Sequence, residues 1–129
     1  MSPILLDTQV LIWWLTDDPR LGMTARQLVA TSEVAVSTVS FWEIAIKSGL
    51  GKLALQVGAA ASAVDADGMR RLAIEDAHLA ALQALARRPD HGDPFDRLLI
   101  AQAQVEGMPI LTADAKFSAY DVAVVSARA

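Results

Sequence analysis

Short apolar runs that alternate with helical segments constrain this chain more than any other feature of its sequence. The runs at 3–6, 34–37, 70–74, 109–112 and 122–125 are each only a few residues long. Strands of that length in alternation with helices predict βαβ units, whose parallel strands need helices on both faces of the sheet. We therefore expect an α/β fold with a mostly parallel central sheet.

Helices are expected between these strands, and a chain of 129 residues fits one domain spanning 1–129. Gly49 and Gly107 are suited to end two of the helices, and Pro94 is suited to open another. The expected helices cover 8–15, 20–30, 40–48, a short stretch within 53–66, 75–87 and 94–106, with a helical turn at 115–119.

Composition indicates in which cellular compartment the protein is expected. The chain has no cysteine, which excludes disulfides and thiolate sites. No signal peptide is visible at Met1–Pro3, and the apolar run at 10–15 is too short to span a bilayer. We expect a soluble, cytoplasmic protein without membrane contact.

Hydrophobic residues make up 53% of the chain, a surplus typical of a domain that buries a face against a partner or a second copy.

The charge balance argues against a simple nucleic-acid binder. The chain has 15 acidic and 11 basic residues and a net charge of -4. Phosphate contacts dominate the affinity of nucleic-acid binders, so such proteins are usually basic. This objection loses weight if several of the carboxylates serve to hold cations.

Four acidic residues lie where an α/β fold usually binds ligands, beyond the carboxyl ends of its strands. Asp7 ends the first strand, Glu43 lies early in the helix after the second, Asp96 lies in the first turn of a later helix, and Asp114 follows the fourth strand. Carboxylates gathered in one cleft repel one another, and a divalent cation relieves that repulsion. Oxygen ligands without His or Cys select Mg²⁺ or Mn²⁺ over zinc, and such an ion suits phosphodiester hydrolysis.

Most of these acids also have a purely structural explanation. Glu43 is spaced to close a capping box with Ser40 and to pair with Lys47 one helical turn later. Asp93 is suited to cap the following helix, whose positive end favours an acid at Asp96. Each of these features would occur in a helix without any ligand.

Two acids remain to be weighed. Asp114 is suited to cap the turn that follows it, whereas Asp7 comes directly after a buried strand, where an acid is costly without a purpose. From composition and spacing alone, a metal site is only slightly favoured over separate structural roles.

Four blocks of sequence, spread from one end of the chain almost to the other, carry a family resemblance. They are LLDTQVLIWWL at 5–15, STVSFWEIAIK at 37–47 with GKL at 51–53, HGDPFDRLLIAQA at 91–103, and ILTAD at 110–114. In order and spacing they resemble VapC-type PIN-domain toxins, the ribonucleases of type II toxin–antitoxin systems. The resemblance thins between 54 and 69.

The resemblance implies a PIN-like three-layer sandwich and a Mg²⁺-dependent endoribonuclease that hydrolyses RNA phosphodiester bonds with a metal-activated water. Mn²⁺ is the alternative ion. Asp7 and Asp96 would be the principal metal ligands, Asp114 would complete the site, and Glu43 would hold the metal or a water further out. These four acids are thus the implied catalytic and metal-binding residues.

The resemblance also implies supporting residues and partners. The hydroxyls of Thr8 and Thr112 would orient carboxylates and waters. Arg97 is the best candidate for contact with RNA, followed by Lys47 and Lys116, although basic residues on helix surfaces are often merely solvated. The implied partners are the RNA substrate, a cognate VapB-type antitoxin and a second copy, giving a homodimer and a toxin–antitoxin hetero-oligomer.

The approach to the third block is unusual. The stretch at 87–90 is longer than the family's usual approach, which puts the substrate-facing loop in question. Arg87 and Arg88 lie there and are further candidates for phosphate contact. We interpret His91 as a loop residue rather than a general base.

Other classes of protein fit the sequence less well. An aspartyl-nucleophile phosphatase needs a second Asp two residues after the first, where Gln9 stands. A receiver-like domain needs paired acids at the first strand and a Lys at the last, and both are missing. The non-enzymatic alternative is a catalytically inactive PIN-like module that acts through dimerisation or partner binding. The presence of all four acids counts against it.

Overall fold

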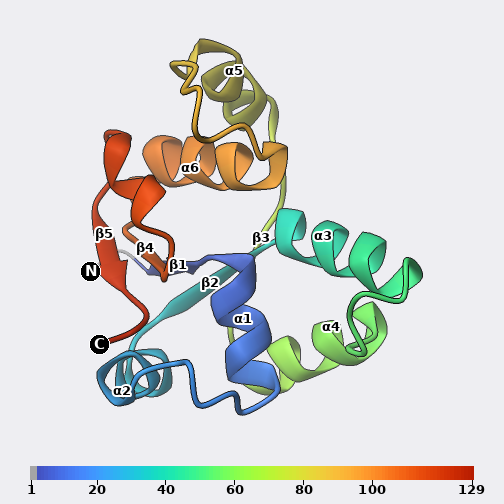
Figure 1. Cartoon of the computed structure of the whole chain (residues 1–129). Helices are drawn as coiled ribbons and strands as arrows, with labels where there is room; N and C mark the ends of the chain where they lie inside the picture. The colour runs from blue at the N-terminus through green and yellow to red at the C-terminus, as the bar shows by residue number, and fades with distance from the viewer. Residues whose placement is uncertain (1–2) are drawn as a thin grey trace.

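The computed structural model describes residues 3–129, in which strands and helices alternate as the sequence predicts (Figure 1). The prediction that no signal peptide begins at Met1–Pro3 falls mainly on Met1 and Ser2, which lie outside the described residues. The strands are β1 (Ile4–Leu6), β2 (Val34–Ser37), β3 (Arg70–Leu72), β4 (Ile110–Thr112) and β5 (Val124–Ser126). The helices are α1 (Thr8–Leu15), α2 (Met23–Thr31), α3 (Thr38–Gly49), α4 (Val57–Ala66), α5 (Asp76–Ala84) and α6 (Pro94–Glu106), followed by the 3₁₀ helix η1 (Ala115–Ala119).

The described strands form one five-stranded sheet in the order β3-β2-β1-β4-β5, and all pairs are parallel. At its centre Leu5 of β1 pairs with Ala35 of β2 on one side and Ile110 of β4 on the other. All three side chains are fully buried, as expected for a parallel sheet covered on both faces. The expected α/β class is confirmed.

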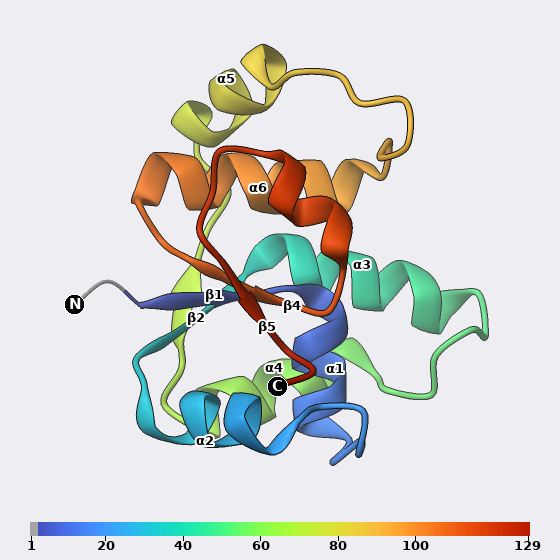
Figure 2. The ribbon, with the colours of Figure 1, turned by 60° about the vertical axis from the view of Figure 1, so that its left-hand side comes forward.

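Helices cover both faces of this sheet, so the molecule has three layers (Figure 2). Neighbouring side chains on a strand point to opposite faces. Leu6 accordingly packs in a core with residues of α1, α2 and α4, whereas Leu5 packs in a second core with residues of α6 and with Phe117 of η1. The expected three-layer arrangement is confirmed.

The direction of winding reverses between β1 and β4. The chain leaves β1 through α1 and α2 on one face, and it reaches β4 through α5 and α6 on the other. Connections that part in this way leave a crevice beyond the carboxyl ends of the two strands, where open α/β sheets bind ligands. Asp7 directly follows β1, and Asp114 lies two residues after the end of β4.

One expected helix is shorter than its sequence suggests. The helix predicted at 75–87 ends at Ala84. The reason is a tertiary contact: the Arg97 guanidinium donates hydrogen bonds to the carbonyls of Leu85, at 3.1 Å, and Ala86, at 3.0 Å. These carbonyls are held outside the helix, and the chain from there to α6 forms a loop.

Two other expected boundaries also move. The helix expected from Arg20 begins at Met23, because the Asp18 carboxylate accepts hydrogen bonds from the Arg20 backbone and guanidinium and holds a turn there. The last strand lies at Val124–Ser126, one to two residues beyond the expected segment. Among residues 3–129, no helix has both the length and the apolar character needed to cross a bilayer.

Gly107 offers a direct test of how α6 ends. It has a φ of 67°, a left-handed conformation that costs other residues about 1–2 kcal/mol. A Cβ at this position would meet no atom within 4 Å, so only backbone strain is at issue. We predict that Gly107→Ala lowers the free energy of unfolding by about 1 kcal/mol in urea denaturation.

Gly49, the last residue of α3, is the matched control. A Cβ there also meets nothing within 4 Å, and its φ is not positive. Since alanine is the better helix former, Gly49→Ala should leave stability unchanged or slightly raised. An equal loss of stability in both variants would contradict this explanation of the α6 terminus.

Candidate functional site

A cavity of about 320 Å³ opens at the carboxyl edge of the sheet. All four acids singled out in the sequence line it, although they come from four separate parts of the chain. The lining residues are Asp7, Thr8, Gln9, Ile12, Trp13, Glu43, Lys47, Asp93, Asp96, Ala113 and Asp114. Folding therefore brings the acidic quartet together, with Asp93 as a fifth acid.

Asp7 lies at the floor of this cavity, between the end of β1 and the start of α1. Its side chain makes no helix-capping hydrogen bond and is only 6% exposed. Burial raises its pKa to about 6, with further repulsion from Glu43 and Asp114, while a hydrogen bond from Thr112 acts in the opposite direction. Asp7 is thus a carboxyl group whose charge is destabilised in the folded chain.

Two threonines support this carboxylate in different ways. The Thr112 hydroxyl donates to Asp7 Oδ2 at 2.7 Å and accepts from the Asp114 backbone N–H at 3.0 Å. The hydroxyl of Thr8 instead hydrogen-bonds Ser40 Oγ at 2.9 Å and joins α1 to α3. The backbone of Thr8 also hydrogen-bonds the Asp7 carboxylate, and the role expected of its hydroxyl in orienting carboxylates and waters stays a prediction.

The structure corrects the interpretation of Glu43. The start of α3 at Thr38 is capped by Ser37, whose hydroxyl accepts a hydrogen bond from the Val39 N–H at 3.0 Å. Ser40 therefore lies inside the helix, and the predicted capping box between Ser40 and Glu43 is wrong. Without the box, Glu43 has no structural role at the start of the helix.

The Glu43 carboxylate is buried and only half satisfied. Its Oε2 accepts from Lys47 Nζ at 2.6 Å, which confirms the predicted pair one turn apart. Its Oε1 is buried and has no hydrogen-bond partner within residues 3–129. A buried acceptor without a partner is costly, so this oxygen calls for a water or a cation.

Asp96 is held at the start of α6. The Asp93 side chain caps this helix by accepting from the backbone N–H groups of Phe95 and Asp96, and Pro94 occupies the first turn. These predicted features are confirmed. They fix the backbone of Asp96 while its carboxylate faces the cavity.

The Asp96 carboxyl also lies in an unfavourable field. Burial raises its pKa to about 7, and the like charges of Asp7, Asp93 and Glu43 add to the rise, against a hydrogen bond from His91. Two acids of one cavity thus hold their protons far above the ordinary range. A divalent cation would remove the cause of both shifts.

His91 lies in the loop before α6, as interpreted from the sequence, but its burial beside the site was not predicted. It is buried, with Nε2 at 3.1 Å from Asp96 Oδ2 and Nδ1 at 3.1 Å from the Tyr120 hydroxyl. Ligand atoms of His91, Asp96 and Asp114 all lie within 4.8 Å of one another. The signal in the sequence was its place in the same block as Asp96, but its partner Tyr120 is distant in the chain.

The three basic residues proposed for RNA contact have different surroundings. Lys47 lines the cavity but is paired with Glu43, which raises the pKa of its amine through a hydrogen bond. Lys116 is exposed on η1. The Arg97 guanidinium is bound to backbone carbonyls and, at 3.3 Å, to the Tyr120 hydroxyl, and it lines a neighbouring hollow instead.

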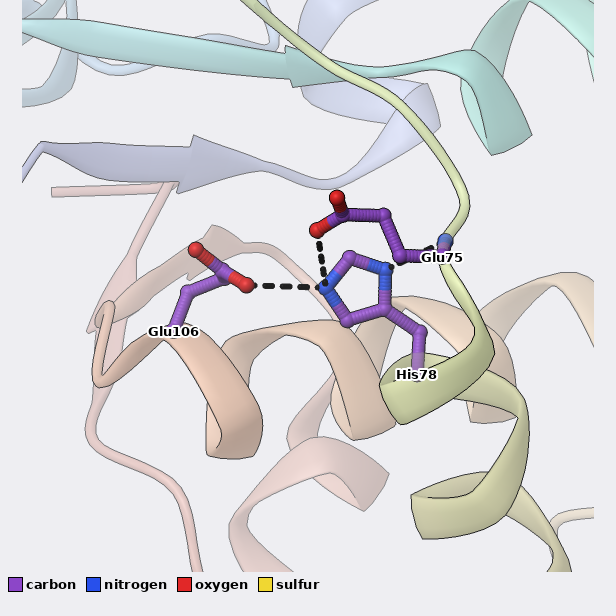
Figure 3. A group of neighbouring side chains, drawn as sticks. All are labelled: Glu75, His78 and Glu106. Carbon is purple, nitrogen blue, oxygen red and sulfur yellow. Dashed lines mark hydrogen bonds and ion pairs between the residues drawn. The ribbon is translucent and has the colours of Figure 1, made fainter.

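A second group of possible metal ligands lies between α5 and α6 (Figure 3). His78 Nε2 is 2.9 Å from Glu106 Oε2 and 4.0 Å from Glu75 Oε1. However, His78 Nδ1 accepts the Glu75 backbone N–H at 3.0 Å, which requires the ring proton to sit on Nε2. That proton is donated to Glu106, so this group is a satisfied buried histidine rather than a metal site.

The chain matches the PIN domain family over residues 4–123 and belongs to that family. It is 30% identical over 122 residues to Ribonuclease VapC22 of Mycobacterium tuberculosis, a match that covers 93% of each protein. Its fold is similar to that in DNA-bound VapBC from Salmonella typhimurium, with a TM-score of 0.70, 18% identity and 98% of each chain covered. It is also similar to a toxin–antitoxin complex from Klebsiella pneumoniae, with a TM-score of 0.64, 20% identity and 95% of each chain covered.

The raised pKa values of Asp7 and Asp96 predict how stability depends on pH when divalent ions are absent. The folded chain holds both protons more tightly than the unfolded chain, so their stabilisation is present below about pH 4 and lost as pH rises through about 6 and 7. In EDTA, the free energy of unfolding should therefore fall between pH 4 and 8. Asp7→Asn should remove on the order of 2 kcal/mol of this fall.

The control for this pH series is Glu33→Gln, which alters an exposed acid remote from the cavity. It should follow the wild-type curve. Urea denaturation at fixed ionic strength gives the measurement, and a wild-type curve that stays flat or rises across the window would show that the cavity does not strain its carboxylates.

Proposed function

We propose that this protein is a divalent-metal-dependent endoribonuclease and the toxin component of a type II toxin–antitoxin system. The observation that carries the proposal is the convergence of five carboxylates and one lysine in a single cavity at the switch point of the sheet. Further support comes from the relative at 30% identity, which is named a ribonuclease.

Three carboxylates of the cavity are the proposed ligands of Mg²⁺, namely Asp7, Asp96 and Asp114, with Mn²⁺ as the alternative ion. Glu43 would hold the ion or a water through its unpartnered Oε1. These donors fit a hard cation because all of them are carboxylate oxygens and because repulsion from neighbouring acids contributes to the raised pKa of Asp7 and of Asp96. When bound, Mg²⁺ lowers the pKa of a water and offsets negative charge that develops on a phosphate.

The remaining residues of the site prepare these carboxylates. Thr112 holds Asp7 by donating to one of its oxygens, and His91 Nε2 lies within hydrogen-bond distance, 3.1 Å, of Asp96 Oδ2. Lys47 binds one oxygen of Glu43, and the other is buried without a partner in the described part of the chain. Its positive charge beside the cavity also makes it a candidate for contact with an RNA phosphate, alongside the exposed amine of Lys116.

The proposed partners are a VapB-type antitoxin and a second copy of the chain, in a homodimer and a toxin–antitoxin hetero-oligomer. Support comes from the toxin–antitoxin complexes among the structures of similar fold. The exposed side chains of Trp42 and Ile46 on α3, the helix that carries Glu43, and of Leu50 directly after it also form an apolar stripe. Because a ribonuclease toxin must reach cellular RNA, we propose that it acts in the cytoplasm.

Asp96→Asn tests the activity. The substitution removes a proposed ligand charge while leaving the Asp93 cap, so we predict at least a ~100-fold loss of Mg²⁺-dependent RNA cleavage with the fold unchanged by circular dichroism. Binding to the antitoxin encoded by the neighbouring reading frame should persist. Asp90→Asn, an exposed acid in the adjacent loop, is the matched control and should cut RNA normally.

One outcome would overturn the proposed endoribonuclease activity. If partner-free wild-type protein with Mg²⁺ or Mn²⁺ cuts no RNA, tRNA and rRNA included, yet binds the antitoxin, the chain is a catalytically inactive PIN-like binding module.

Binding of the ion can be measured without activity. An ion that binds only the folded chain stabilises it, by about 2.7 kcal/mol at a concentration 100 times its Kd. We predict that Mg²⁺ raises the Tm of the wild type in a saturable manner at pH 7.5, and that Asp7→Asn abolishes the rise. Glu33→Gln should respond as the wild type does, and a Tm that is insensitive to Mg²⁺ and Mn²⁺ would count against a metal at this site.

A further inference from the structure

A second hollow, of about 470 Å³, lies beside the acidic cavity. It is formed mainly by the loop between α5 and α6, which Figure 2 shows extending beyond the start of α6. His91 connects the two spaces: it is a lining residue of the hollow, and its Nε2 lies 3.1 Å from Oδ2 of Asp96, which lines the cavity. The lining residues are Arg87, Arg88, Pro89, His91, Gly92 and Arg97.

The hollow concentrates positive charge in a chain whose net charge is -4. Three of its lining residues are arginines. Within residues 3–129, the ion pairs involve other cations, and no carboxylate pairs with Arg87, Arg88 or Arg97. The charge of these three side chains is therefore available to an anion.

Contacts with neutral groups hold two of these arginines in position. Arg88 donates to the Ala119 carbonyl at 2.6 Å and lies over the Tyr120 ring, with its guanidinium carbon 5.4 Å from the ring centre. Arg97 is held by the carbonyls of Leu85 and Ala86. Such partners fix a guanidinium without neutralising it, and Arg87 stands exposed beside them.

We propose that this hollow binds an RNA phosphate, namely the neighbour, on the same strand, of the phosphate at which the RNA is cut. This proposal rests on the proposed function. The RNA strand would pass from the acidic cavity, past His91, to Arg87 and Arg88. Guanidinium groups suit phosphate oxygens because their planar donors can bind two oxygens at once. The contact positions the backbone and reads no base, so it supplies affinity without sequence preference.

This subsite also resolves the objection raised by the net charge. A cavity of five acids repels RNA, and the few basic residues of the chain would offset that repulsion only if they were concentrated next to the cavity. The arginine hollow meets this condition, since His91, one of its lining residues, contacts Asp96 of the acidic cavity.

Salt dependence of RNA binding tests the proposal. The probe is a fluorescein-labelled single-stranded 20-nucleotide RNA, with EDTA present to prevent cleavage, titrated by anisotropy at several salt concentrations. Each phosphate contact on a single strand contributes about 0.7 to the slope of log K against log salt. We expect Arg87→Ala to weaken binding and reduce the slope by about 0.7, and Arg87→Ala with Arg88→Ala to reduce it by about 1.4.

Arg70→Ala is the matched control, because Arg70 is an exposed arginine at the opposite, amino end of β3. It should bind the probe with the wild-type slope. Since Arg88 also holds Ala119, Arg87→Ala alone provides the test that does not disturb the fold. An unchanged slope for Arg87→Ala, or no binding of the probe by the wild type, would overturn the subsite.

Cleavage assays separate this inference from the proposed function. If both hold, Arg87→Ala raises KM in Mg²⁺ and leaves kcat nearly unchanged, since it removes binding rather than chemistry. If the wild type cuts RNA and Arg87→Ala keeps the wild-type slope, the subsite is overturned and the proposed function stands. If the wild type cuts no RNA and Arg87→Ala reduces the slope, the ribonuclease activity is overturned and the phosphate subsite stands.

Discussion

Repulsion among carboxylates that folding buries together is the constraint on which the rest of this structure depends. Asp7 is fixed by the central strand, and its backbone N–H is bonded to the Leu111 carbonyl, so it cannot leave the cavity without disturbing the sheet. Asp96 is fixed by the cap of α6. The two apolar cores on either side of the sheet supply the free energy that holds these groups in place. Repulsion of this kind would be relieved by a divalent cation, which is why the proposed metal site rests on it.

The same constraint explains how charge is divided over the molecule. Acids gather at the switch point, while three arginines gather across the His91 side chain. Tyr120 connects the two regions, since its hydroxyl contacts both His91 and Arg97. The proposed contact with RNA is compatible with the negative net charge, because the screening length in physiological salt, about 8 Å, keeps the influence of distant acids small.

Local patterns in the sequence were sufficient for the fold class and for part of the site. The strand and helix alternation, the Asp93 cap and the Glu43–Lys47 pair each depend on residues a few positions apart, and the structure confirms them. Features that depend on distant partners were missed. The Ser40 capping box is wrong because Ser37 takes the capping position, and Ser40 instead meets Thr8 from another helix. The length of α5 and the burial of His91 were likewise decided by Arg97 and Tyr120, through contacts that no local pattern encodes.

The central claim is that these distant carboxylates form one cation site, and anomalous diffraction from crystals of the protein soaked in Mn²⁺ tests it most directly. The account predicts a peak between the carboxylates of Asp7 and Asp96, within reach of Asp114. A strong peak at Glu75, His78 and Glu106 with none in the cavity, or no peak at all at saturating Mn²⁺, would contradict it.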